Sequence, residues 1–219
     1  MARNVARDER EAARRKMQLI QAGFTLFSAQ GIENVSMASV AAKADVGPAT
    51  MYNYFKTKVN LVVAISGYIW KSVWEETLGN VGMDKMMQMD AYQLIVQYTD
   101  MILHLYKTRP DILKFSGNYK TFVVREGAQK HQLEEHLSPL EPIEKLFQIK
   151  YEEAKENHCI NTAIPEQEMF TTITLTMLGM AERYAEGIIW ADNQKPDHIK
   201  ELEYTREMIL LWVRGNSAE

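Results

Sequence analysis

The chain has 219 residues, of which 46% are hydrophobic and 25% are charged. This length allows one large or two small globular domains with a substantial core, and the few prolines and glycines exclude collagen-like and low-complexity proteins. The only cysteine, Cys159, cannot form a disulfide within the chain. The charged N-terminus lacks the apolar stretch of a signal peptide, and no run approaches the ~18 apolar residues of a membrane helix. We therefore expect a cytoplasmic protein with no membrane partner.

Charge is distributed unevenly along the chain. Residues 1–60 hold nine basic and five acidic residues, a formal charge of +4, whereas the remainder carries −8 and the whole chain −4. A basic segment on an acidic body is expected where only that segment meets a polyanion such as nucleic acid. A charged tail that is simply solvated is the alternative explanation.

The spacing of apolar residues predicts helices from the start of the chain. Apolar residues recur at steps of four and three from Ala13 to Phe27, which makes one helical stripe, and Gly31 is a natural stop. Ser36 can cap a short helix over 37–43.

A third and a fourth helix follow. Gly47 and Pro48 open a short helix that runs to about residue 55, because proline belongs at the first helical position. Thr57 can cap the next helix, which we expect to end near residue 78. This fourth helix is apolar on two sides, so we expect it to be buried between layers and to carry any shift from the N-terminal segment to the body.

Five further helices are predicted in the second part of the chain. The stretch Thr171–Thr176 is β-branched enough to suggest a strand, but the apolar residues around it have helical spacing, and periodicity outranks propensity. No two convincing strands lie close enough to pair. The predicted fold is therefore all-α, with helices at about 91–108, 111–126, 139–157, 165–190 and 197–213.

Two short helices joined by a tight turn, downstream of a basic tail, are typical of a helix-turn-helix. The second helix carries small and polar groups that can enter a major groove, followed by hydroxyls and an ammonium suited to phosphate oxygens. The residues predicted to face base edges are Pro48, Ala49, Thr50 and Asn53, and those predicted to hold phosphates are Tyr52, Tyr54 and Lys58.

The segment from Leu19 to Lys58 resembles the DNA-binding domain of tetracycline-repressor (TetR) type regulators. Its most diagnostic part is Thr50-Met51-Tyr52-x-Tyr54-Phe55-x-x-Lys58. The resemblance implies an N-terminal DNA-binding domain over 1–60, with Ser36 as a further backbone contact, and an effector-binding and dimerisation domain over 61–219. It also implies a homodimer that binds a palindromic operator in double-stranded DNA as a repressor released by a small, largely apolar effector.

Four residues depart from the pattern of that family. Asp45 stands in the turn where glycine is usual, Gly47 where a serine cap is common, Ala49 where glycine is frequent, and Val59 where an acidic residue usually follows the lysine. None of these changes removes a group that anchors the DNA backbone. They affect the expected operator sequence more than the expected function.

The second part of the chain is rich in aromatic residues and methionines, which suits an adaptable apolar pocket. Most of these residues are expected to be ordinary core. The resemblance implies that the last two helices, over about 165–190 and 197–213, form the dimer interface. The residues proposed as an effector lining are Trp70, Tyr119, Phe122, Tyr151 and Met177.

No motif of catalysis is present. The chain lacks a phosphate-binding GxxxxGK[ST], a dinucleotide-binding GxGxxG and a zinc-binding HExxH, so we predict no catalytic residues, no cofactor and no metal. Two alternatives to a ligand-released repressor are kept open. One is a helical small-molecule binding protein or enzyme that has lost DNA binding, and the other is a regulator whose body binds no ligand.

Overall fold

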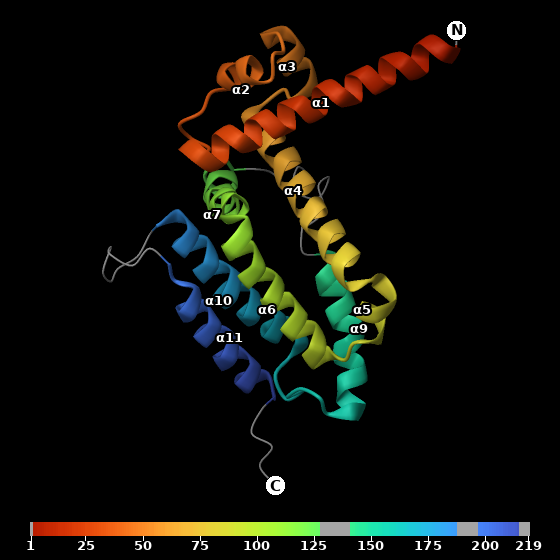
Figure 1. Cartoon of the computed structure of the whole chain (residues 1–219), viewed down its shortest axis with the longest axis vertical. Coiled ribbons are helices and arrows are strands. Elements are labelled where there is room, and N and C mark those ends of the chain that lie inside the picture. Colours follow the sequence, from red (N-terminus) through yellow and green to blue (C-terminus); the bar gives the residue numbers. More distant parts are fainter. Residues whose placement is uncertain (1, 128–140, 188–196, 215–219) are drawn as a thin grey trace. The chain divides into compact units, whose positions relative to one another are not determined.

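The computed structural model describes residues 2–127, 141–187 and 197–214, which form ten helices and no strand (Figure 1). This confirms the predicted all-α fold. The helices are α1 (Ala2–Gln30), α2 (Met37–Lys43), α3 (Pro48–Tyr54), α4 (Lys58–Val81), α5 (Met83–Gln88), α6 (Ala91–Thr108), α7 (Pro110–Arg125), α9 (Glu141–Asn157), α10 (Glu166–Glu186) and α11 (Ile199–Arg214).

The chain forms two compact units. The first contains the residues up to Lys71 and the second half of α7 from Asn118, and the second contains 72–117 and the chain from residue 140 onwards. Both α4 and α7 therefore contribute to both units. The predicted boundary after residue 60 concerns functional domains and stays a prediction.

The first unit packs α1, α2 and α3 around the start of α4. Leu19 and Phe27 of α1, Met51 of α3 and Leu61 of α4 are essentially inaccessible to solvent. As predicted, α4 is apolar nearly all round, and every residue from Leu61 to Ser66 is buried. This small core holds α2 and α3 in place.

The second unit is a helical bundle built on α6, which contacts α9, α10 and α11. Asp90 caps α6 in a capping box, in which the Gln93 backbone N–H donates to the Asp90 carboxylate (2.8 Å) and the Asp90 N–H donates to the Gln93 side chain (3.1 Å). One face of α6 is buried from Ala91 to Leu105. Figure 1 shows α10 and α11 side by side in this bundle.

Several helices differ from their predicted bounds. The basic N-terminal segment is not a separate tail, because α1 begins at Ala2. Helix α4 continues past Gly79 to Val81 and ends where Gly82 adopts a φ of 86°, a conformation that favours glycine. The short helix α5 that follows was not predicted, since its six residues are too few to show a periodicity.

The segment around Thr171–Thr176 is helical, which confirms the choice of periodicity over β-propensity. The interior of α10 is fixed by buried Met169, Ile173 and Met177 at steps of four. Parts of two predicted helices, 139–140 and 188–190, lie outside the described residues.

Candidate nucleic-acid interface and effector cavity

Helix α2 has defined ends. The Ser36 hydroxyl accepts a hydrogen bond from the Ser39 backbone N–H (3.0 Å), so Ser36 caps α2 as predicted. At the other end the Ala44 N–H donates to the Val40 carbonyl and the Val46 N–H donates to the Ala41 carbonyl, both at 2.9 Å. These backbone bonds close the tight turn that leads into α3.

Asp45 occupies a left-handed backbone conformation in this turn, with a φ of 54°. Glycine adopts such a conformation without steric cost, whereas aspartate is one of the few other residues that tolerate it. The departure at Asp45 is thus accommodated by the same backbone that a glycine would adopt, and the turn is kept.

Helix α3 presents most of the predicted DNA-contacting residues together. Gly47 lies at its N-cap and Pro48 at its start, as predicted. Met51 is fully buried and Phe55 is 3% exposed, so one face of α3 is fixed to the core. On the rest of its surface Pro48, Ala49, Tyr52 and Asn53 are exposed, and Thr50 and Tyr54 are half-buried.

Lys58, at the start of α4, is engaged inside the first unit. Its ammonium donates to the Glu33 carbonyl at 3.2 Å and lies 5.8 Å and 5.6 Å from the ring centroids of Phe27 and Phe122. Burial lowers the pKa of Lys58, and the charges of Glu126 and Glu33 counter this in part. Lys58 would have to leave these contacts to reach a phosphate.

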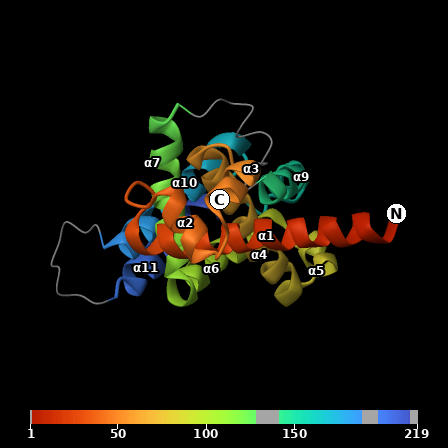
Figure 2. The same cartoon turned by 90° about the horizontal axis from the view of Figure 1, so that it is seen from above.

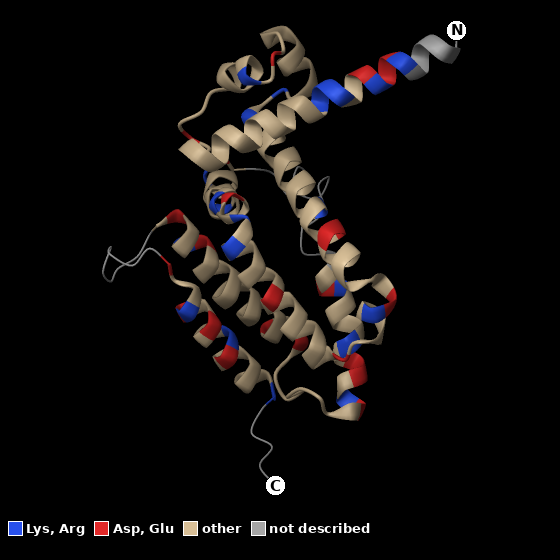
Figure 3. Cartoon of the chain, in the orientation of Figure 1, with Lys and Arg blue, Asp and Glu red and all other residues tan. Residues whose placement is uncertain are grey.

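The N-terminal half of α1 carries a cluster of basic residues (Figure 3). Arg7, Arg10, Arg14 and Arg15 are exposed, and Arg15 pairs with Glu11 one turn away. Figures 1 and 2 show this half of α1 running away from α2 and α3. This cluster of positive charge is thus carried on a helix that extends away from α2 and α3.

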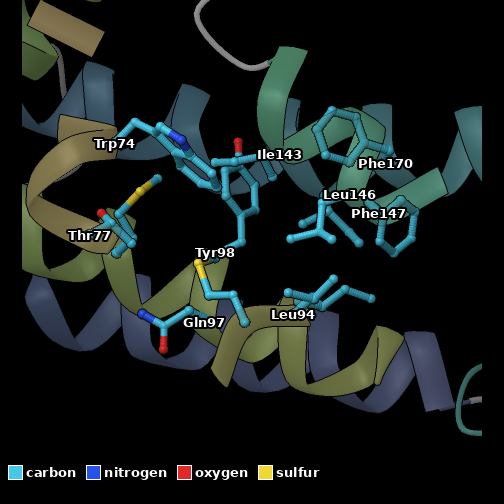
Figure 4. Close-up of a pocket in the computed structure, with 13 residues that line it drawn as sticks. Trp74, Thr77, Leu94, Gln97, Tyr98, Ile143, Leu146, Phe147 and Phe170 are labelled. Carbon is cyan, nitrogen blue, oxygen red and sulfur yellow. The ribbon is translucent and has the colours of Figure 1, made fainter. Parts of the chain in front are cut away.

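The second unit contains an apolar cavity (Figure 4). Its free volume is about 30 Å³, room for roughly two waters, so side chains fill most of it in this structure. Two flexible methionines, Met86 and Met101, belong to its wall. The lining comes from α4, α5, α6, α9 and α10 and consists of Trp74, Thr77, Met86, Leu94, Ile95, Gln97, Tyr98, Met101, Ile143, Leu146, Phe147, Phe170 and Ile173.

Aromatic rings form one side of the cavity. The Phe170 ring stacks on Tyr98 at 6.1 Å and lies 5.7 Å from Phe147. The Tyr98 hydroxyl lies 3.3 Å from the Thr174 hydroxyl, and burial raises the pKa of Tyr98 to about 12. Tyr98 is therefore neutral over the physiological range. In Figure 4, Thr77 and Gln97 lie at the side opposite Phe147 and Phe170.

The five residues predicted as an effector lining do not line this cavity. Trp70 and Phe122 are buried in the first unit, and Tyr119, also there, is half-buried with its hydroxyl hydrogen-bonded to Ser66. Tyr151 and Met177 lie closer, since the Tyr151 ring is 6.0 Å from Phe147 and Met177 follows the lining residue Ile173 by one helical turn. Their role as effector contacts stays a prediction.

Sequence reasoning did not single out the residues that line this cavity, including Trp74, Leu94 and Phe147. These residues repeat at the same helical spacing as ordinary core residues, so no local signal separates them. Among the described residues, no group of three or more histidines, cysteines or acids could hold a metal ion. Within the same part of the chain, no helix is both long and apolar enough to cross a membrane.

Residues 19–65 match the family model of the bacterial regulatory proteins of the tetR family. The HTH-type transcriptional repressor KstR of Mycolicibacterium smegmatis is 41% identical over 53 residues, which are 24% of this chain and 26% of the relative. KstR of Rhodococcus jostii is 42% identical over 50 residues, 23% of this chain and 24% of the relative. The chain thus spans about a quarter of the length of the curated relatives it matches.

The likeness to solved structures extends over nearly the whole chain. A bacterial regulatory protein in the tetR family from Rhodococcus RHA1 has a TM-score of 0.63 at 16% identity, over 91% of this chain and 96% of that one. AibR in complex with isovaleryl coenzyme A and operator DNA has a TM-score of 0.58 at 14% identity, over 89% and 96%. At these identities the likeness establishes the fold. The sequence likeness to tetR-family regulators is confined to residues 19–65, and the rest of the chain shares their fold.

Proposed function

We propose that the protein is a sequence-specific DNA-binding transcriptional regulator, and specifically a repressor released by a small effector. The helix-turn-helix carries this proposal, because α3 is anchored by buried Met51 and leaves Ala49, Tyr52 and Asn53 exposed. A short helix held in this way can enter a major groove with its N-terminal residues at the base edges. Curated relatives that match about a quarter of the chain are transcriptional repressors.

In this proposal the exposed residues of α3 divide into two roles. Pro48, Ala49, Thr50 and Asn53 meet base edges, and Tyr52 and Tyr54 donate their hydroxyls to phosphates. Ser36 and Lys58 complete the phosphate contacts, Lys58 after release from the Glu33 carbonyl. The exposed arginines of α1 add sequence-independent attraction to the duplex.

We further propose a homodimer formed through α10 and α11. Tyr204, Met208 and Leu211 are 61%, 69% and 72% exposed and make one apolar stripe along α11. Leu175 on α10 is also largely exposed. An apolar stripe of this length is expected to be covered, and a two-fold dimer would present two helix-turn-helix elements to a palindrome.

The proposed effector site is the apolar cavity of the second unit. Its wall is almost wholly apolar, and the long side chains of Met86 and Met101 can rearrange around an incoming molecule. The neighbour AibR was solved with a small-molecule thioester and operator DNA together, which supports a coupling of ligand and DNA in this fold. Effector binding then lowers operator affinity by favouring a conformation that fits the operator poorly.

Selection of duplexes from a random library by the purified protein, at about 0.15 M salt, tests the proposal. Enrichment of a palindrome with half-sites about one helical turn apart is the expected result. The variant Asn53→Ala should change the enriched sequence, and Gln148→Ala, an exposed residue of α9 in the second unit, should leave it unchanged. If no sequence is enriched, the proposal fails in favour of a helical small-molecule binding protein that has lost DNA binding.

A further inference from the structure

A polar groove adjoins the apolar cavity within the second unit. The groove has a free volume of about 220 Å³, compared with about 30 Å³ for the cavity. Thr77, Gln97 and Met101 line both spaces, so the two share a wall. A ligand that moves these three side chains aside would occupy one continuous site with an apolar end and a polar end.

The groove is rich in hydrogen-bond acceptors and in negative charge. Its lining includes the carboxylates of Glu76 and Asp100, the side chains of Asn80 and His104, and no lysine or arginine. Asp100 is paired with Arg206, whose Nε lies 2.7 Å from its carboxylate. Glu76 is exposed and makes no ion pair with a described residue, although it lies near enough to Arg109 for its charge to contribute to raising the pKa of that guanidinium. Glu76 supplies the negative charge of the groove lining that no direct ion pair neutralises.

The positions of the lining residues indicate how a ligand would be oriented in the cavity and the groove. Phe147 and Phe170 lie at the far side of the cavity, and Thr77 and Gln97 lie toward the groove (Figure 4). An apolar chain would therefore point toward the two rings, with its polar group beside Glu76. An anionic head group there would be repelled by the carboxylate, whereas a cation would be attracted.

We propose that the effector is a cationic amphiphile, with its apolar chain in the cavity and its positive head group in the groove beside Glu76. This rests on the proposed effector site and names the class of molecule that it takes. A second groove, lined by Lys85, Gln88 and Gln93, meets the cavity at Gln97 alone. That groove suits an anion, but it shares one wall residue with the cavity rather than three.

Three probes with the same apolar chain separate these cases: octyltrimethylammonium, 1-octanol and octanoate. We expect octyltrimethylammonium to raise the melting temperature most and octanoate least, because at equal concentration the ligand that binds more tightly stabilises the folded state more. Titration calorimetry should show Glu76→Gln weakening octyltrimethylammonium binding roughly fivefold. The matched variant Glu75→Gln removes the same charge outside the groove lining and should change the affinity little.

A bulky residue at the cavity rim tests the position of the chain. Ile143 is half-buried there, so Ile143→Trp should weaken octyltrimethylammonium and octanol alike without unfolding the bundle. Tighter binding of octanoate, lost in Lys85→Gln, or no effect of Glu76→Gln on the cation, would overturn the proposal. So would the absence of binding by all three probes. Duplex selection is independent of these titrations, so failure of the regulator proposal is distinguishable from failure of this one.

Discussion

The ammonium of Lys58 donates a hydrogen bond to the backbone carbonyl of Glu33, which lies 25 positions earlier in the chain. Glu33 in turn pairs through its carboxylate with Arg125 of α7. With the Phe27 and Phe122 rings beside the ammonium, these contacts join the start of α4 to the end of α1 and to α7. A residue predicted from the sequence to hold phosphate thus also holds the first unit together.

Lys58→Ala should therefore lower stability. We expect a loss of about 1–2 kcal/mol, from one hydrogen bond and two cation–π contacts, measured by denaturant unfolding. Because Lys58 is proposed to bind a phosphate after it leaves the Glu33 carbonyl, the salt slope of duplex binding should also fall, by about one unit. Lys56→Ala, an exposed lysine two residues away, is the control. Unchanged stability would show that the contacts with Glu33, Phe27 and Phe122 contribute little, and an unchanged salt slope would show that Lys58 does not bind phosphate.

Replacements at Asp45 should rank by their tolerance of a positive φ. Asp45→Gly should be the most stable variant, and Asp45→Ala should be about 1 kcal/mol less stable than the parent, because a Cβ is disfavoured at a φ of 54°. Asp45→Asn removes the charge but keeps the conformational tolerance, so it should match the parent in thermal unfolding. Equal stability of the Ala and Gly variants would mean that the turn changes conformation.

The sequence predicted those features that are determined by residues close together in the chain. The bounds 37–43 and 91–108 were predicted correctly, the first because Ser36 marks a helix start within one turn. The residues that line the cavity were not predicted. Leu94 and Phe147 come together only because α6 packs against α9. The spacing of apolar residues along one helix does not show which residues of another helix they will contact.

A charge on the apolar stripe of α11 should prevent the proposed dimer. Leu211→Arg should convert the protein to a monomer in analytical ultracentrifugation and weaken duplex binding, because a buried unpaired charge opposes association. Ile149→Arg places the same charge on an exposed residue of α9 and should leave the dimer intact. If Leu211→Arg stays dimeric while Ile149→Arg does not, the interface lies on α9 rather than α11.

The last prediction concerns Glu166, the first residue of α10. Burial, with the charges of Glu144 and Glu152, raises the pKa of Glu166 above its usual 4.5. One of its carboxylate oxygens is buried with no hydrogen-bond partner among the described residues. The folded chain therefore binds this proton more tightly than the unfolded chain, so the stability contributed by Glu166 is present below about pH 4.5 and lost as the pH rises through the folded pKa.

Glu166→Gln removes this charge and should raise the melting temperature at about pH 7, with the gain disappearing at about pH 4. The control is Glu168→Gln, an exposed acid in the same first turn, which measures the loss of the favourable interaction between a carboxylate and the helix N-terminus. Both variants lose this interaction, so the difference between their melting temperatures reports the burial of Glu166 and its repulsion by Glu144 and Glu152. If both variants respond to pH in the same way, the raised pKa has no consequence for stability.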